Sequence, residues 1–223
     1  MRILVIAPHP DDEVLGCAGT IKKHTKAGDT VSLCIVTKPY TPDWTQEYIE
    51  NKQKEIKNSC AVLGIKEVHF LDFPTVKLDT VGQKNLNDAI ADCVKRVNPQ
   101  ILFIPFWQDI NNDHRLVSEA GLVAARPRPG ISIKKVLAYE ALSETEWGIN
   151  QAEKLEDVFL PNYYEDIGQF IESKKEAMSC YASELKEYPH PRSLEGIEIL
   201  AKKRGMEAGL LYAEAFKLVR QIH

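Results

Sequence analysis

One short segment near the amino terminus concentrates the side chains that could do chemistry. Residues 8–13 read PHPDDE, so one imidazole and three carboxylates directly follow an apolar run. Acids crowded in this way cost electrostatic energy unless a cation compensates their charge. A divalent metal ion would do so, and a turn brings the side chains of His9 and Asp12, three positions apart, to the same side. The sequence therefore predicts a metal site in which both residues are ligands.

A catalytic metal site keeps three protein ligands and leaves one position open for water. We predict that the third ligand is His114, in residues 109–115 (DINNDHR), directly after the fourth predicted strand. His24, His69 and His223 compete poorly, because no ligand set surrounds any of them. Two imidazoles and one carboxylate suit Zn²⁺, which we predict as the cofactor, although the same set also holds Fe²⁺.

Each motif also has a purely structural interpretation. The acids of residues 8–13 can cap the helix that follows, because carboxylates are favoured at the positive end of a helix dipole. This interpretation explains one or two of the acids but not the histidine. In the second motif, Asn112 or Asp113 can be the N-cap of a helix over residues 114–126, which does not exclude metal binding by His114.

Hydrophobic patterns predict an alternation of strands and helices in the first half of the chain. Continuous apolar runs are typical of strands covered on both faces, and the segments between them have helical spacing. This alternation predicts an α/β protein, a three-layer Rossmann-like fold with a mainly parallel central sheet. Both motifs follow strands, so they fall at the carboxyl edge of the sheet, where ligands bind in this class. We expect strands at residues 2–7, 30–37, 68–71 and 100–105, and helices at 13–27, 45–63 and 83–97.

The second half of the chain is expected to be mainly helical. We expect a helix at residues 115–127, a strand at 134–139, and helical segments at 166–186 and 194–220. The turn 188–192 (YPHPR) separates the last two, and Gly205 marks a candidate interruption of the final one. Because no repeat or long linker divides the sequence, residues 1–223 are predicted to form a single domain.

The bulk properties argue against several classes of partner. The net charge is −4 and no basic stripe is visible, so no nucleic-acid partner is expected. The apolar run at the amino terminus is too short for a secretory signal or a membrane span, so no membrane partner is expected. The five cysteines are an odd number without a CxxC pair. We therefore predict free thiols and a cytoplasmic protein.

These motifs resemble those of the PIG-L/LmbE family of zinc-dependent N-deacetylases. The family signature is a strand followed by PHPDDE or AHPDDE and a later Asp-His pair, which is Asp113-His114 here. The resemblance covers nearly the whole chain. It implies a hydrolase that removes an N-acetyl group from an N-acetylglucosamine-type substrate, either a sugar conjugate or a nucleotide sugar. It also implies a homo-oligomer, with contacts through the late helices.

The resemblance assigns roles to the motif residues. His9, Asp12 and His114 would be the metal ligands, and Asp11 would be the general base. The chemistry agrees, because a metal ion polarises both water and the amide carbonyl, while the adjacent carboxylate of Asp11 can take the proton of the water. Asp11 can then return that proton to the departing amine.

The chain departs from the family pattern at one position. Members with an HxxH-type second motif have a histidine three residues before the ligand histidine, where it stabilises the oxyanion, and that residue is Asn111 here. Either the amide of Asn111 donates a hydrogen bond instead, or the turn 188–192 closes over the site. In the second case His190 serves as acid or oxyanion donor and Arg192 contacts the substrate. The alternative is a proline-rich turn at the surface.

Two further residues have both a functional and a structural interpretation. Asp113 can orient an imidazole ligand, as metal sites require, or it can cap the following helix. Trp107 lies between the fourth predicted strand and the second motif. Its ring can stack against a sugar or simply pack in the protein.

Three other functions stay open. The metal site can serve a different amide or an ester. The chain can be a nucleotide-binding Rossmann-like module, although its first strand-turn lacks the GxGxxG phosphate cradle. It can also be a sugar binder that lost catalysis with Asn111, although Asp11 is retained and a pure binder has no use for a free carboxylate there. Metal content separates the nucleotide-binding module from the other functions. Acetate release tests whether the chain is a sugar binder that lost catalysis.

Overall fold

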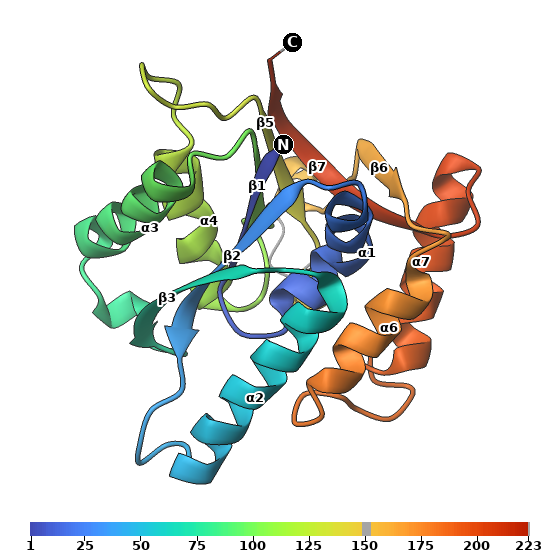
Figure 1. The fold of residues 1–223 in the computed structure, drawn as a ribbon, viewed down its shortest axis with the longest axis horizontal. Coiled ribbons are helices and arrows are strands. Elements are labelled where there is room, and N and C mark those ends of the chain that lie inside the picture. Colours follow the sequence, from blue (N-terminus) through green and yellow to red (C-terminus); the bar gives the residue numbers. More distant parts are fainter. Residues whose placement is uncertain (149–152, 223) are drawn as a thin grey trace.

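The central feature of the fold is a seven-stranded sheet, seen in the computed structural model of residues 1–148 and 153–222 (Figure 1). Its strands are β1 Arg2–Ala7, β2 Thr30–Lys38, β3 Glu67–Pro74, β4 Ile101–Pro105, β5 Lys135–Tyr139, β6 Tyr163–Asp166 and β7 Ala213–Gln221. They lie in the order β3-β2-β1-β4-β5-β7-β6. β1 to β5 pair in parallel, whereas β7 is antiparallel to both of its neighbours.

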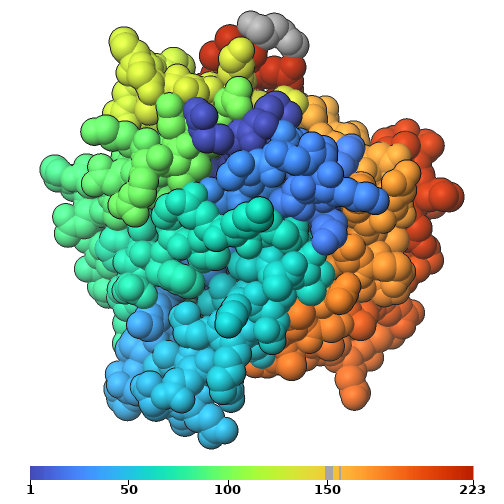
Figure 2. All heavy atoms as spheres, viewed as in Figure 1, coloured from blue at the N-terminus to red at the C-terminus, as the bar shows by residue number. Residues whose placement is uncertain are grey.

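Helices cover both faces of this sheet (Figure 1). One face carries α1 Asp12–Lys26, α2 Gln46–Leu63, α6 Ile171–Cys180 and α7 Leu194–Ala208, and the other carries α3 Gln83–Val97 and α4 Asn112–Ala124. The short elements are η1 Leu78–Thr80, α5 Thr145–Gly148 and η3 Leu155–Asp157. Helices α2 and α6 pack against each other, and their atoms form one continuous surface in Figure 2.

β1 shows why the sheet has a core on each side. Its side chains alternate between the two faces, and Ile3 and Val5 pack in the cluster that contains residues of α1 and α2. Leu4 and Ile6 pack in the opposite cluster, with residues of α3 and α4. An uninterrupted apolar strand is what a parallel sheet covered on both faces requires. The predicted α/β fold with a mainly parallel central sheet is confirmed.

A buried ion pair anchors α1, the helix that follows the PHPDDE turn. The Glu214 carboxylate of β7 accepts hydrogen bonds from the backbone N–H groups of Gly19 and Thr20, at 2.9 and 2.7 Å. The Lys174 ammonium of α6 bonds Glu214 at 2.6 Å and the carbonyl oxygen of Leu15 at 2.8 Å. The two side chains thus bond backbone groups of α1 and tie this helix to the carboxyl-terminal part of the chain.

The predicted elements of the first half are confirmed, but the second half corrects two predictions. Residues 194–220 are not one helical segment, because α7 ends at the left-handed Gly209 and residues 213–221 form β7. Residues 166–186 are not one helix either: β6 ends at Asp166, and α6 begins at Ile171. Alanine, glutamate, lysine and leucine in β7 favour helix locally, and pairing with β5 and β6 overrides that preference.

Two further observations concern the cysteines and the apolar character of the helices. All five cysteines are free, and four of them are buried. Across residues 1–148 and 153–222, no helix combines the length and the apolar character that crossing a bilayer requires.

Candidate metal centre

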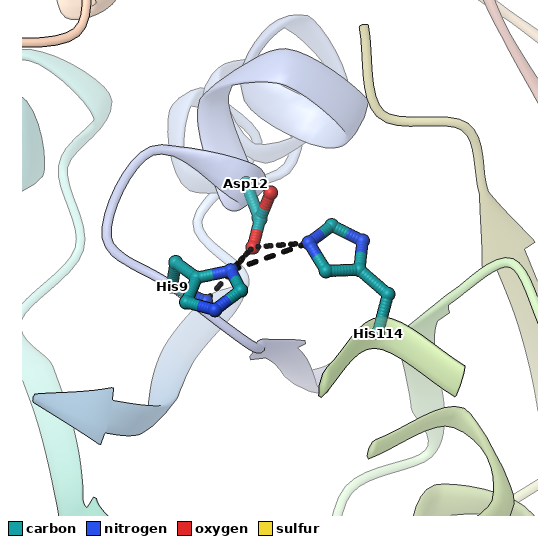
Figure 3. Close-up of side chains that lie close together, drawn as sticks. All are labelled: His9, Asp12 and His114. Atoms are coloured by element: carbon teal, nitrogen blue, oxygen red, sulfur yellow. Dashed lines mark hydrogen bonds and ion pairs between the residues drawn. The ribbon is translucent and has the colours of Figure 1, made fainter. Parts of the chain in front are cut away.

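Three side chains from the two motifs meet at the carboxyl edge of the sheet (Figure 3). The Nδ1 atom of His9 lies 3.4 Å from Oδ2 of Asp12 and 3.3 Å from Nε2 of His114. Nε2 of His114 lies 3.3 Å from the same Asp12 oxygen. The three predicted ligands therefore present one donor atom each at the corners of a nearly equilateral triangle.

This spacing fits a tetrahedral metal ion. Ligand atoms at about 2.0–2.1 Å from Zn²⁺ in tetrahedral geometry are about 3.3–3.4 Å apart. The second carboxylate oxygen of Asp12, Oδ1, is buried and has no hydrogen-bond partner. An orphaned carboxylate oxygen beside two facing imidazole nitrogens is costly in a protein interior, and a shared cation removes that cost. The donor set and its spacing thus suit zinc.

The pKa values of the three triad residues also indicate that this point favours a cation. Burial lowers the pKa of His9, but hydrogen bonds to Asp113 and Asp12 outweigh it and raise the pKa to about 9. Burial likewise lowers the pKa of His114, and the charges of Asp12 and Asp109 raise it well above its ordinary value. For Asp12, burial raises the pKa, and the two imidazoles more than reverse that effect. The surrounding carboxylates therefore favour positive charge at this point.

Local structure explains how the triad is assembled. β1 ends at Ala7, and the backbone N–H of His9 donates to Asp12 Oδ2 at 2.8 Å, which closes the turn into α1. The other motif opens α4, whose N-cap is Asn111, because its Oδ1 accepts the backbone N–H of Asp113 at 3.0 Å. β1 and β4 are neighbours, so their carboxyl ends bring the two turns together.

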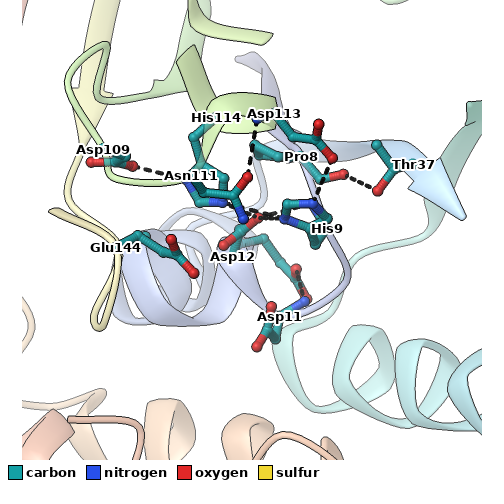
Figure 4. A network of polar contacts seen from close by, with 12 residues as sticks. Pro8, His9, Asp11, Asp12, Thr37, Asp109, Asn111, Asp113, His114 and Glu144 are labelled. Carbon is teal, nitrogen blue, oxygen red and sulfur yellow. Dashed lines mark hydrogen bonds and ion pairs between the residues drawn. The ribbon is translucent and has the colours of Figure 1, made fainter. Parts of the chain in front are cut away.

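Both imidazoles are oriented by a further carboxylate (Figure 4). Nδ1 of His114 is 2.8 Å from Asp109 Oδ2, and the other Asp109 oxygen accepts the hydroxyl of Thr145 at 2.6 Å. Nε2 of His9 is 3.1 Å from Asp113 Oδ2. Such contacts select the ring nitrogen that is left for a metal. Asp113 was predicted from the sequence, whereas Asp109 was missed, although it lies in the same motif.

Asp113 also connects the site to the loop after β3. Its Oδ2 accepts the backbone N–H of Val76 at 2.6 Å, and Oδ1 accepts that of Leu78 at 3.2 Å. The same carboxylate therefore contacts a predicted ligand, His9, and fixes a loop. Capping of α4 falls to Asn111 instead of Asn112 or Asp113.

Asp11 lies beside the triad in an unusual backbone conformation. Its φ is 120° and its ψ is −23°, a region that costs a residue with a side chain about 1–3 kcal/mol. Its backbone N–H donates to Glu13 Oε2 at 3.2 Å, and the Tyr181 hydroxyl donates to Glu13 Oε1 at 2.7 Å. Burial raises the pKa of the Asp11 carboxyl well above its ordinary value, and the charge of Arg192 acts against that rise. Glu13 and Tyr181 were not predicted as site residues.

The turn 188–192 reaches the same site through Arg192, which donates to Asp11 Oδ2 at 3.1 Å and to Glu144 Oε1 at 2.9 Å. In Figure 4 the carboxylates of Asp11 and Glu144 lie on one side of the triad. His190 accepts the backbone N–H of Arg192 at Nδ1, at 3.1 Å, and its ring stands edge-on to Trp147. Glu144 was missed as a site residue because nothing in the sequence placed it opposite the first motif.

The other residues singled out from the sequence lie as follows. Trp107 packs against Phe106, with ring centroids 4.5 Å apart, so it has a packing contact, and sugar stacking stays a prediction. His24 bonds Asp29 at 2.7 Å, and His69 lies on β3. His223 lies outside the described residues.

The comparison with known families gives a direct match. Residues 4–125, just over half of the chain, match the PIG-L family, GlcNAc-PI de-N-acetylase. The chain belongs to the PIG-L family. The matched residues include both motifs and all three residues of the triad.

Individual relatives of this PIG-L family member are distant. Diacetylchitobiose deacetylase of Thermococcus kodakarensis is 28% identical, over 98% of this chain and 83% of that protein. The crystal structure of the conserved protein TT1542 of Thermus thermophilus superposes with a TM-score of 0.79 at 23% identity, covering 100% and 97% of the two chains. The 4-carboxy-2-hydroxymuconate hydratase of Pseudomonas putida superposes with a TM-score of 0.77 at 20% identity, covering 100% and 98%. At such identities the structures share the fold, which by itself does not decide the reaction.

Proposed function

We propose that this protein is a zinc-dependent hydrolase that removes an N-acetyl group from an N-acetylglucosamine-type substrate, a sugar conjugate or a nucleotide sugar. The observation that carries the proposal is the triad of His9, Asp12 and His114 with tetrahedral ligand spacing, next to the buried carboxylate of Asp11. The name of the matching family and of the Thermococcus relative support the amino-sugar substrate.

The chemistry is hydrolysis of an amide. A divalent ion held by the triad supplies Lewis acidity toward water and the amide carbonyl. Asp11 takes a proton from the water that attacks the acetyl carbon, and a C–O bond forms. The C–N bond then breaks, and Asp11 gives the proton to the leaving nitrogen, so that acetate and the free amino sugar result. Asp11 is suited to this role because it is buried at the site and is not one of the ligands.

Other residues of the chain orient and bind in this proposal. Asp113 holds His9 in the ring orientation needed for ligation. Asn111 is half-buried beside the triad, and with Oδ1 committed to the α4 cap its amide N–H₂ is left as a donor for the oxyanion. His190 accepts at Nδ1, so in the neutral ring Nε2 carries the proton and is a second candidate donor. Trp107 is the candidate stacking face for the sugar ring.

The proposal extends to compartment and assembly. Five free thiols, four of them buried, suit the reducing cytoplasm. A homo-oligomer with contacts through the late helices is expected from the family resemblance. Light scattering coupled to size-exclusion chromatography measures the mass in solution, and a mass of one chain would contradict that part of the proposal.

Acetate release is the experiment that tests the function. Metal-replete protein is incubated with a panel of N-acetylglucosamine compounds that includes a disaccharide, a conjugate and a nucleotide sugar, and acetate is quantified beside an Asp11→Asn control. We expect release from at least one compound and its loss in the control, with equal metal content in both proteins. If no compound releases acetate although metal is bound, the amino-sugar substrate is wrong, and the site serves another amide or an ester or only binds.

A further inference from the structure

Arg192 connects the carboxyl-terminal part of the chain with the PHPDDE turn. Each of its three guanidinium nitrogens has a protein partner. Nε donates to Ser143 Oγ at 2.7 Å, Nη2 donates to Glu144 Oε1 at 2.9 Å, and Nη1 donates to Asp11 Oδ2 at 3.1 Å. Nη1 also lies 3.6 Å from Glu184 Oε2. One planar group therefore bridges three acidic side chains that come from separate segments of the chain.

Further contacts restrain the acidic partner Glu184 and the backbone of Arg192. Glu184 is fixed by Lys52 and by the Tyr48 hydroxyl, whose distances to Oε1 are 2.6 and 2.8 Å. The backbone N–H of Arg192 donates to His190 Nδ1 at 3.1 Å, and the next residue, Ser193, caps α7. Both ends of the arginine are thus restrained before any substrate arrives, which lowers the entropy lost in orienting it.

Asp11 needs such support on two sides. Its strained backbone is tied down through the N–H bond to Glu13. Its carboxylate has one side-chain hydrogen-bond partner among the described residues, and that partner is Arg192. A general base that is displaced by about 1 Å can lose on the order of 10²-fold in rate. The direction in which Asp11 points is therefore decided by a residue 181 positions away in the sequence.

We propose that Arg192 is a positioning residue that holds the Asp11 carboxylate toward the triad, and that it does not bind the substrate. This inference rests on the proposed function of Asp11. A substrate contact was the expectation from the sequence, but each nitrogen of the guanidinium already bonds a protein group, namely Ser143, Glu144 or Asp11. The rigid fork of arginine matches three partners at fixed angles, and the point charge of lysine cannot.

The test compares Arg192→Lys with Arg204→Lys. Arg204 is a matched control, because it is also a largely buried arginine bonded to two acids, Glu140 and Glu207, and it is not part of the site. Both variants keep the positive charge that stabilises the neighbouring acids. We expect kcat for acetate release to fall on the order of 10²-fold in Arg192→Lys, with KM changed by less than about threefold and metal content unchanged. Arg204→Lys should keep both parameters.

Other outcomes have distinct meanings. A rise in KM with normal kcat in Arg192→Lys would make Arg192 a substrate contact and overturn the proposal, as would unchanged values of both. Equal losses in the two variants would indicate a general folding defect and also overturn it.

Crystal structures give a readout that does not depend on turnover. In zinc-loaded Arg192→Lys, we expect the Asp11 carboxylate to rotate away from its position in the unmodified protein, while the triad keeps its geometry. An unmoved Asp11 would contradict the positioning role even if no substrate were ever found. If wild-type protein releases no acetate but Asp11 moves in the variant, the proposed function fails and the positioning role of Arg192 stands.

Discussion

The two halves of this molecule contribute different things to one site. The first half, through α4, contains the three donor residues of the triad and Asp11, and it corresponds to the residues that match the PIG-L family, 4–125. The second half contributes no ligand of the triad, but it supplies Arg192 and Tyr181, which hold Asp11 and Glu13, and the ion pair that anchors α1. Donor residues can thus lie in a local motif while their orientation depends on residues far away in the sequence.

The largest effect is expected at Asp11, in the half that contains the proposed reacting groups. Asp11→Asn keeps the size of the side chain and removes its ability to take a proton. We expect kcat to fall on the order of 10²–10⁴-fold at normal metal content, measured by acetate release and metal analysis. Unchanged turnover would place the general base elsewhere, and the second half would become the place to search for it.

In the second half, the largest effect is expected at Lys174, and it concerns the stability of the fold. Lys174→Met leaves the carboxylate of Glu214 buried without its cation, and we expect the free energy of unfolding to fall by about 3–5 kcal/mol. Urea denaturation measures this, with Lys202→Met, in an exposed pair with Glu198, as a control that changes it by less than about 1 kcal/mol. A loss as small as in the control would mean that this anchor of α1 contributes little.

Metal binding to the triad, in the first half of the chain, should stabilise the folded protein by an intermediate amount. Zinc at about 100 times its Kd should stabilise the folded protein by about 2.7 kcal/mol, seen as a rise in Tm. His114→Ala should abolish the rise, because one corner of the triad is lost, while His24→Ala should retain it. If His114→Ala responds to zinc as fully as the unmodified protein, the metal binds elsewhere.

The smallest effect is expected at the contact between the halves. Tyr181→Phe removes the hydroxyl that bonds Glu13, and we expect stability to fall by about 1–2 kcal/mol. We expect kcat to fall less than in Arg192→Lys, because Asp11 keeps its side-chain partner. Tyr164→Phe, whose hydroxyl contacts the exposed Glu207, serves as the control in the same unfolding and rate measurements. A larger rate loss in Tyr181→Phe than in Arg192→Lys would transfer the positioning role from Arg192 to Glu13.

The same division marks how far the fold could be predicted. α3 begins and ends where the pattern predicts, at residues 83 and 97, because apolar spacing and the packed face agree there. β7 was predicted as helix, because its alanine, glutamate and lysine residues carry no strong local preference for strand. Its conformation comes from the hydrogen bonds that β5 and β6 offer on either side. Such pairing joins residues far apart in the chain, and a local window does not contain it.

The class of fold, the two motifs and the three donor residues could be predicted from the amino-acid sequence, because each of these depends on spacing within short segments. The bond between Arg192 and Asp11, the contact of Asp109 with His114 and the position of Glu144 at the site follow from the folded structure alone. These contacts escape a local prediction because a buried charge must find its partner in space. The fold decides which partner that is, and the distance along the chain does not.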